Sequence, residues 1–215
     1  MTGRSLPGSW TAVTLAEVAV LNPKYEVASD QSLDALVHFV PMAAVRENFE
    51  GIDVTRTRPL REARKGYTPF RQGDVLLAKI TPCMENGKGA LVPELAHGVG
   101  FGSTEFHVLR TLGSVRPEWL AYYLSQKSFR EEARRNMTGS AGQLRVPSRW
   151  LAGVQVPVPP LSDQGRILER LDELLPVIDS GMAELRAAQA KLAQYRQSVL
   201  NAAFEGTLTA DWRKQ

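Results

Sequence analysis

The residues in this sequence that are able to do nucleophilic or metal chemistry are few and far apart. One cysteine and three histidines are spread along the chain, at Cys83, His38, His97 and His107. A metal site needs several ligands at close spacing, and a triad needs a nucleophile with a base beside it. None of the four has such a neighbour in the sequence, and one cysteine builds no disulfide framework. The sequence therefore predicts no metal centre and no catalytic residue, and it places the histidines on the surface or on strands.

Two further segments look like parts of a catalytic or cofactor site. Asn-Pro-Lys-Tyr at 22–25 is similar to the Asn-Pro-Pro-Tyr motif of amino-methyltransferases, but its second proline is missing and no glycine-rich cofactor loop accompanies it. We interpret it as a turn after Val20. The glycine-rich segment 98–102 would cradle a phosphate only if a helix followed, whereas 104–109 is typical of a strand. We interpret 98–102 as a loop that approaches DNA, or as a flexible turn.

Positive charge is concentrated in the first three quarters of the chain. The net charge is +3, and residues 1–160 contain 19 Lys and Arg against 15 Asp and Glu, whereas 161–215 contain 7 against 8. Within 56–71, six positive side chains are opposed only by Glu62. A polyanion such as DNA would be attracted to this stretch. The alternative is a solvated loop.

The first 160 residues combine short apolar runs with glycine and proline. A helix is expected over 117–135, because Pro117 suits a first helical turn and apolar residues recur from Trp119 at helical spacing. Strands are expected, with a turn at 72–74 before the second of them, at 38–41, 75–80, 90–92, 104–109 and 154–157. This mixture without regular βα alternation predicts an α+β fold, with one mixed α/β domain over 1–160.

A long helix is predicted over 161–206, followed by a tail at 207–215. Ser162 suits its N-cap, Asp163 suits the positive end of its dipole, and Pro176 is expected to kink it. At about 1.5 Å per residue, 163–204 would span roughly 63 Å, more than the about 35–40 Å width of the preceding domain. A 3-4 apolar spacing, typical of a coiled coil, includes Ile167, Leu171, Leu174, Ile178, Leu185, Leu192, Tyr195 and Val199. This seam needs a partner helix that the chain does not supply.

Several segments, in order, resemble the specificity subunit of type I restriction–modification systems. Pro-Pro-Leu-Ser-Asp-Gln at 159–164 is similar to the family's entry into a conserved-region helix, and further similar segments lie at 171–176, 195–209, 6–10, 73–83 and 102–106. The last three resemble parts of a target recognition domain. A family member usually has two recognition domains and two helical regions, whereas this chain has one of each and is identified as a half-length form. Met1 and the family-like end at 209–213 favour a whole chain over a random fragment.

The resemblance implies DNA recognition without catalysis. The chain would select a bipartite target in double-stranded DNA. A modification methyltransferase subunit would bind S-adenosylmethionine and methylate adenine, and a restriction motor-nuclease subunit would cleave. No cofactor is expected on this chain. Two copies with antiparallel helices would form a homodimer with a palindromic target, because protein symmetry is mirrored in the half-sites.

The sequence also predicts where the protein works, and it leaves two alternative functions open. The sequence has no signal peptide and no apolar run long enough for a membrane span, so we expect a cytoplasmic protein. One alternative function is an interaction protein that docks a partner through its coiled-coil helix without binding DNA. The other is a fragment of a self-contained methyltransferase–endonuclease whose catalytic domain lies elsewhere.

Candidates for DNA contact follow from side-chain type. Phosphates are bound by Lys, Arg or backbone amides, whereas bases are read by forked or amide side chains. The basic stretch, the end of the strand at 75–80, the turn at 85–89 and the loop at 138–145 supply Arg56, Arg58, Arg64, Lys65, Lys79, Thr81, Asn86, Lys88, Gln143 and Arg145. Each has a structural alternative, such as a lysine that lies along its strand. The resemblance does not assign any of them to a base.

Overall fold

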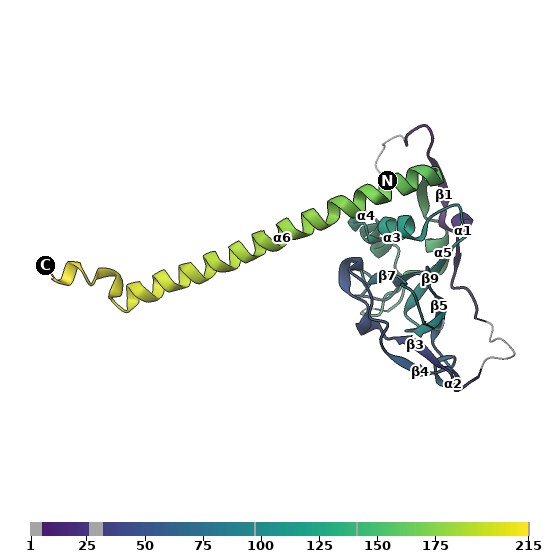
Figure 1. Cartoon of the computed structure of the whole chain (residues 1–215), viewed down its shortest axis with the longest axis horizontal. Coiled ribbons are helices and arrows are strands. Elements are labelled where there is room, and N and C mark those ends of the chain that lie inside the picture. The colour runs from purple at the N-terminus through teal and green to yellow at the C-terminus, as the bar shows by residue number, and fades with distance from the viewer. Residues whose placement is uncertain (1–5, 26–31, 97, 141, 215) are drawn as a thin grey trace. The chain divides into compact units, whose positions relative to one another are not determined.

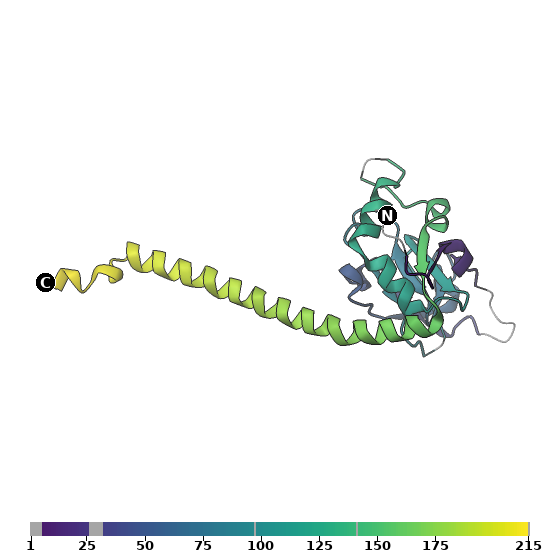
Figure 2. The same cartoon turned by 90° about the horizontal axis from the view of Figure 1, so that it is seen from above.

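The computed structural model describes residues 6–25, 32–96, 98–140 and 142–214, and Figures 1 and 2 show it from two sides. His97 lies outside these residues. The chain divides into two compact units, Met1–Gly165 and Arg166–Gln215. The first unit contains strands and short helices, and the second consists mainly of helix α6 (Leu161–Phe204), whose first residues belong to the first unit. The predicted α+β fold with a long C-terminal helix is therefore confirmed.

Three sheets are formed by the described strands of the first unit. The central sheet is antiparallel throughout, in the order β2 (Ala19–Leu21), β9 (Phe106–Thr111), β6 (Val75–Ala78), β7 (Gly89–Leu91). The outer sheet has the order β4 (Thr57–Pro59), β3 (Leu36–Val40), β8 (Val99–Gly102), β5 (Thr68–Arg71), and its β3–β8 pair is parallel. The third sheet is the antiparallel pair of β1 (Thr11–Thr14) and β10 (Gln155–Val158).

Short helices cover the central sheet and connect the strands. One face of this sheet packs against α1 (Leu15–Val18), α3 (Pro117–Ser125), α4 (Lys127–Arg135) and α5 (Ser148–Ala152). The outer sheet is flanked by α2 (Leu60–Ala63). Short 3₁₀ turns lie at Met42–Ala44, Glu47–Phe49, Thr207–Thr209 and Trp212–Lys214. Figure 1 shows α3 and α4 beside the central strands.

The strand β6 is buried on both faces, which explains its unbroken apolar sequence. Val75 and Leu77 contribute to the core beneath the helices, whereas Leu76 and Ala78 contribute to a second core that also contains Phe70 of the outer sheet. Because successive side chains of a strand point to opposite faces, a strand between two layers needs apolar residues at every position. The two sheets therefore pack face to face, with the helices on the far side of the central sheet.

Residues 99–102 of the glycine-rich segment form strand β8, so their interpretation as a loop or flexible turn was wrong. Its glycines make room for neighbours. A Cβ at Gly100 would lie 2.3 Å from Cε2 of Phe70, and a Cβ at Gly102 would lie 2.8 Å from the carbonyl oxygen of Val40. Phe70 is fully buried, so the strand accommodates its ring only where a side chain is missing.

The single helix expected over 117–135 is two helices, because Gln126 adopts an extended conformation with φ −61° and ψ 138° between α3 and α4. Both helices bury their own apolar side chains, among them Leu124 in α3 and Phe129 in α4. These two residues are five apart, so an unbroken helix would place them roughly 140° apart around its axis. The break allows both to enter the same core.

Helix α6 differs from its prediction in two details. It begins at Leu161, and the carbonyl of Pro160 already accepts hydrogen bonds from the amides of Asp163 and Gln164, both at 2.9 Å. Ser162 therefore lies inside the first turn and is not the N-cap, whereas Asp163 occupies the first turn as expected. The helix continues through Pro176, and Figure 2 shows a gradual curve along it where a kink was expected. Pro176 lies on the exposed surface of the helix.

Candidate nucleic-acid interface

Four of the predicted DNA-contact residues are brought together where β6 ends. The amide of Thr81 donates to the carbonyl of Leu144 at 2.9 Å, and the amide of Val146 donates to the carbonyl of Lys79 at 2.8 Å. Ile80 also forms an isolated bridge with Arg145. These contacts join two segments more than sixty residues apart in the sequence, so that Lys79 and Thr81 lie beside the loop that carries Gln143 and Arg145. We call these four residues and Glu105 the strand-end cluster.

The strand-end cluster is organised around an ion pair that sequence reasoning missed. Nε of Arg145 lies 2.9 Å from Oε2 of Glu105, and NH2 lies 2.7 Å from Oε1. The amide of Lys79 donates to the carbonyl of Glu105 at 2.9 Å. Hydrogen bonds from Arg145 lower the pKa of the Glu105 carboxyl, and the same bonds raise the pKa of the guanidinium. The pair is charged at neutral pH and holds Arg145 in one plane.

The other members of the cluster differ in how far they are free to contact a ligand. The hydroxyl of Thr81 donates to the carboxylate of Glu85 within the same turn. Gln143 is exposed on the loop, where its backbone N–H donates to the carbonyl of Ser140 at 2.9 Å. Lys79 is half-buried. The amide side chain of Gln143 and the forked guanidinium of Arg145 are of the types that read bases, and Lys79 is of the type that binds phosphates.

Asn86 and Lys88 lie apart from this cluster and hold other segments in place. The side-chain amide of Asn86 donates to Oε1 of Glu47 at 2.8 Å, and Nζ of Lys88 lies 3.4 Å from the carbonyl oxygen of Met42. Both contacts fasten the 3₁₀ turns that follow β3. The structural alternative for these two residues therefore has direct support, and their DNA contacts stay predictions.

The basic stretch is not one loop, because it runs through β4, α2 and β5, which contain Arg58, Arg61 and Arg71, whereas its other three basic residues lie next to these elements. Arg58 stacks on the aromatic ring of Phe39, with its guanidinium carbon 4.0 Å from the ring centroid, and a second ring, Tyr67, lies at 5.8 Å. Such a cation–π contact fixes the arginine on the outer sheet. Arg56 and Lys65 are exposed, so their side chains are accessible to a polyanion.

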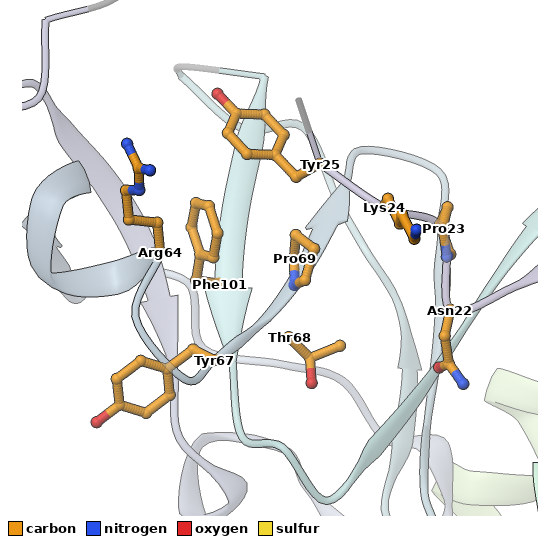
Figure 3. A pocket seen from close by; sticks show the side chains of 9 residues that line it. All are labelled: Asn22, Pro23, Lys24, Tyr25, Arg64, Tyr67, Thr68, Pro69 and Phe101. Atoms are coloured by element: carbon orange, nitrogen blue, oxygen red, sulfur yellow. The ribbon is translucent and has the colours of Figure 1, made fainter. Parts of the chain in front are cut away.

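Arg64 lines a cavity of about 480 Å³ on the outer sheet. Figure 3 shows the guanidinium of Arg64 near the rings of Tyr25 and Phe101, with Lys24 on the far side of the opening. Tyr25 and Phe101 meet edge to face, with centroids 5.4 Å apart. Cationic and aromatic linings are common where proteins contact nucleic acids, because phosphates attract the cations and bases stack on the rings.

The Asn-Pro-Lys-Tyr segment forms part of this cavity, yet its asparagine is used inside the fold. Oδ1 of Asn22 accepts the amide N–H of Val108 at 3.0 Å, and Nδ2 lies 3.4 Å from Nδ1 of His107. The other ring nitrogen of His107 lies 2.8 Å from the carbonyl oxygen of Val146. Burial lowers the pKa of His107, so the neutral ring is favoured. Asn22 follows β2 directly with φ 51°, in agreement with a turn, and its amide is occupied by structural contacts.

His38, like His107, is held by contacts within the fold. His38 lies on β3, where Nδ1 is 2.7 Å from the carbonyl oxygen of Val54 and Nε2 accepts the amide N–H of Ala96 at 3.1 Å. Within the described ranges, no three His, Cys, Asp or Glu side chains are grouped as a metal site requires. Among the helices that the structure describes, none is both long and apolar enough to cross a bilayer.

The seam of α6 is exposed along most of its length. In this single chain, Ile167 and Leu171 are partly covered, whereas the others are open to solvent: Leu174, Ile178, Leu185, Leu192, Tyr195 and Val199. A helix with such a stripe normally buries it against another helix.

Two polar networks of the first unit were not predicted from the sequence. Buried Gln164 joins the start of α6 to the segment before α3: Oε1 accepts the amide of Arg116 at 2.8 Å, and Nε2 donates to the carbonyls of Ser114 and Pro159. Its place in the Pro-Pro-Leu-Ser-Asp-Gln segment was the available signal. Asp74 and Arg110 form a bidentate pair with two contacts of 2.8 Å. A carboxylate in a turn before a strand gives no hint of this partner.

Comparisons with known proteins place the chain in a family. No family model matches it. It is 37% identical over 175 residues to the specificity subunit of the type I restriction enzyme EcoAI from Escherichia coli, and 38% identical over 175 residues to that of EcoEI from the same species. These alignments cover 81% of this chain and 29% of each relative.

Solved structures have the same fold over about half of their length. The HsdS subunit from Thermoanaerobacter tengcongensis superposes with a TM-score of 0.68 and 22% identity, covering 88% of this chain and 48% of that one. A chain from a structure on complex assembly and conformational transition of the type I R-M system gives 0.67 and 22%, covering 94% and 47%. The chain spans about half the length of these solved neighbours, and its alignments cover 29% of each curated relative. It thus belongs to the specificity-subunit family of type I restriction enzymes.

Proposed function

We propose that this chain is a DNA-reading subunit of a type I restriction–modification complex, and that it directs adenine methylation and restriction to a bipartite target. The observation that carries the proposal is the match over 175 residues to two proteins named as specificity subunits. The strand-end cluster supports it, because it combines cations with an exposed amide side chain. Arg56, Arg64 and Lys65 add positive charge on the outer sheet, where a DNA backbone would be attracted.

The chemistry belongs to partner subunits in this proposal. The side-chain amide of Asn22 contacts Val108 and His107 inside the fold, so a structural role accounts for the segment that is similar to a methyltransferase motif. A modification methyltransferase subunit binds S-adenosylmethionine and transfers the methyl group, and a motor-nuclease subunit cleaves. This chain needs no cofactor for its own part, and it works in the cytoplasm, where the cell's DNA is accessible.

We propose further that two copies pair through antiparallel α6 helices. The chain covers 47–48% of the solved neighbours, so two copies supply about as much protein as one of those chains. The exposed apolar seam supports helix pairing, and a two-fold axis makes both helices present the same residues. Such a dimer has two identical recognition domains, and its target has identical, inverted halves. The modification subunit docks on the same helices.

Methylome sequencing of cells that express the chain with its modification subunit tests the proposal. We expect new adenine methylation at one bipartite motif whose halves are inverted copies. A bipartite motif with different halves would refute the homodimer and retain DNA recognition. No new methylation, although both proteins are present as a folded complex, would refute DNA recognition and favour an interaction protein that docks a partner through its helix.

A further inference from the structure

The guanidinium of Arg145 is held from one side and left open on the other. Glu105 takes Nε and NH2 in a bidentate contact, and NH1 donates to the carbonyl oxygen of Gln143 at 3.1 Å. A guanidinium has five N–H groups in a planar fork. Among the described residues these bonds take three of them and leave one on each terminal nitrogen. The side chain of Arg145 remains 40% exposed.

We propose that Arg145 reads a guanine in the DNA target through these two remaining N–H groups, with Glu105 as the residue that positions it. The inference rests on the proposed function and adds the base to it. Guanine is the base that presents two adjacent acceptors, N7 and O6, in the major groove, and two parallel N–H groups of an arginine match them. Adenine and cytosine place an amino donor in the groove, which opposes an N–H group.

Charge favours base reading over phosphate contact at this position. The negative charge of Glu105 offsets part of the attraction that Arg145 would have for a phosphate, yet the ion pair gives the remaining N–H groups fixed directions. Hydrogen-bond direction matters for a base edge, whereas charge matters for the backbone. Rotation of the Arg145 side chain is limited as well, because the Glu105 contact and the Gln143 carbonyl fix the plane of the guanidinium from two sides. Lys79, next to the pair, is the better candidate for a phosphate.

A second arginine–carboxylate pair provides a matched control. Arg110 makes the same bidentate contact with Asp74, but that carboxylate is buried and also accepts the amide N–H of Arg71 at 2.7 Å. This pair lies within the fold and joins β9 to the turn before β6. R110K is therefore expected to lower thermal stability and to leave base discrimination unchanged.

The test uses the complex of the full chain with its modification subunit and duplexes that contain the mapped target. Each guanine is replaced in turn by 7-deazaguanine, which lacks the N7 acceptor. For the unaltered protein, one position in each half-site should weaken specific binding about tenfold, since half of a bidentate contact is lost. R145K should be insensitive to that replacement and should bind non-specific DNA as the unaltered chain does. R110K should keep the sensitivity.

The outcomes separate this inference from the proposed function. If 7-deazaguanine weakens binding at no position, or if R145K keeps the full sensitivity, Arg145 does not read guanine, although DNA recognition stands. If the unaltered complex has no preferred target, the proposed function itself fails. E105Q should lower discrimination while non-specific affinity stays equal or rises, because a negative charge is removed. Equal loss of both would overturn the positioning role.

Discussion

Replacing two leucines in the middle of the α6 seam is the strongest test of helix pairing. Leu185 is 61% exposed and Leu192 is 67% exposed in the single chain, so roughly two thirds of each side chain remains to be buried. Full burial of a leucine stabilises by about 1.5–3 kcal/mol. A two-fold pair buries four of them, which amounts to about 4–8 kcal/mol of association free energy. Replacing both leucines by glutamate removes this term and brings four negative charges into the seam.

The expected result is a loss of pairing by at least a thousandfold in Kd, because each 1.4 kcal/mol is about a factor of ten. Light scattering of the unaltered chain should give the mass of a dimer, and the L185E/L192E variant should give the mass of a monomer at the same concentration. The double variant A190E/Q197E is the matched control, since it adds the same charges seven residues apart on the opposite side of the helix. It should remain a dimer.

A dimer of unchanged Kd in L185E/L192E would refute the reasoning, because the seam would then contribute nothing to association. An unaltered chain that is monomeric would refute self-pairing. Circular dichroism and thermal unfolding of the full-length variant check that it is folded. The unfolding transition of the first unit should not change, because both leucines lie in the second unit. Binding to the modification subunit, measured on the same variants, reports the second proposed use of the seam.

Two further predictions concern the recognition domain. G100A is expected to lower the free energy of unfolding by about 1–3 kcal/mol, because its Cβ would meet the buried ring of Phe70, whereas G8A, with open space around it, should change it by less than about 0.5 kcal/mol. Equal urea midpoints for both variants would contradict the packing of β8. His107 has a pKa lowered by burial from its usual 6.5, so its contribution to stability is complete above that value and falls as the pH drops below it. H107Q should flatten the acid side of a stability–pH curve, and an unchanged slope would show that burial against Val146 does not control it.

Much of the architecture was predictable because it depends on neighbours in the sequence. The turn at 72–74, the strand β6 after it and the first turn of α6 with Asp163 all follow from local patterns. The α6 seam follows from a spacing repeated over five heptads, and a helix places residues three and four apart on one face whatever surrounds it. The segments that resemble specificity subunits are likewise runs of adjacent residues.

The recognition domain departs from prediction where distant segments meet. Gly100 lies in a strand because β8 pairs with β3 and β5, and Phe70 occupies the space where a side chain would be; no pattern within 98–102 records these neighbours. The break at Gln126 occurs because Leu124 and Phe129 enter one core from two directions. In both cases the deciding contact is absent from the local sequence, so glycine content pointed to a loop at 98–102 and helical periodicity pointed to a single helix over 117–135.

The sequence by itself determined that this chain has a long helix with an apolar seam, and that its segments resemble those of specificity subunits. Only the tertiary structure decided which candidate side chains share a surface. Arg145 lies beside Lys79 and is oriented by Glu105, whereas Asn86 and Lys88 are used to hold 3₁₀ turns. The physical reason is that helical periodicity is a property of adjacent residues, but an ion pair or a reading surface requires side chains that only folding brings within a few ångströms of one another.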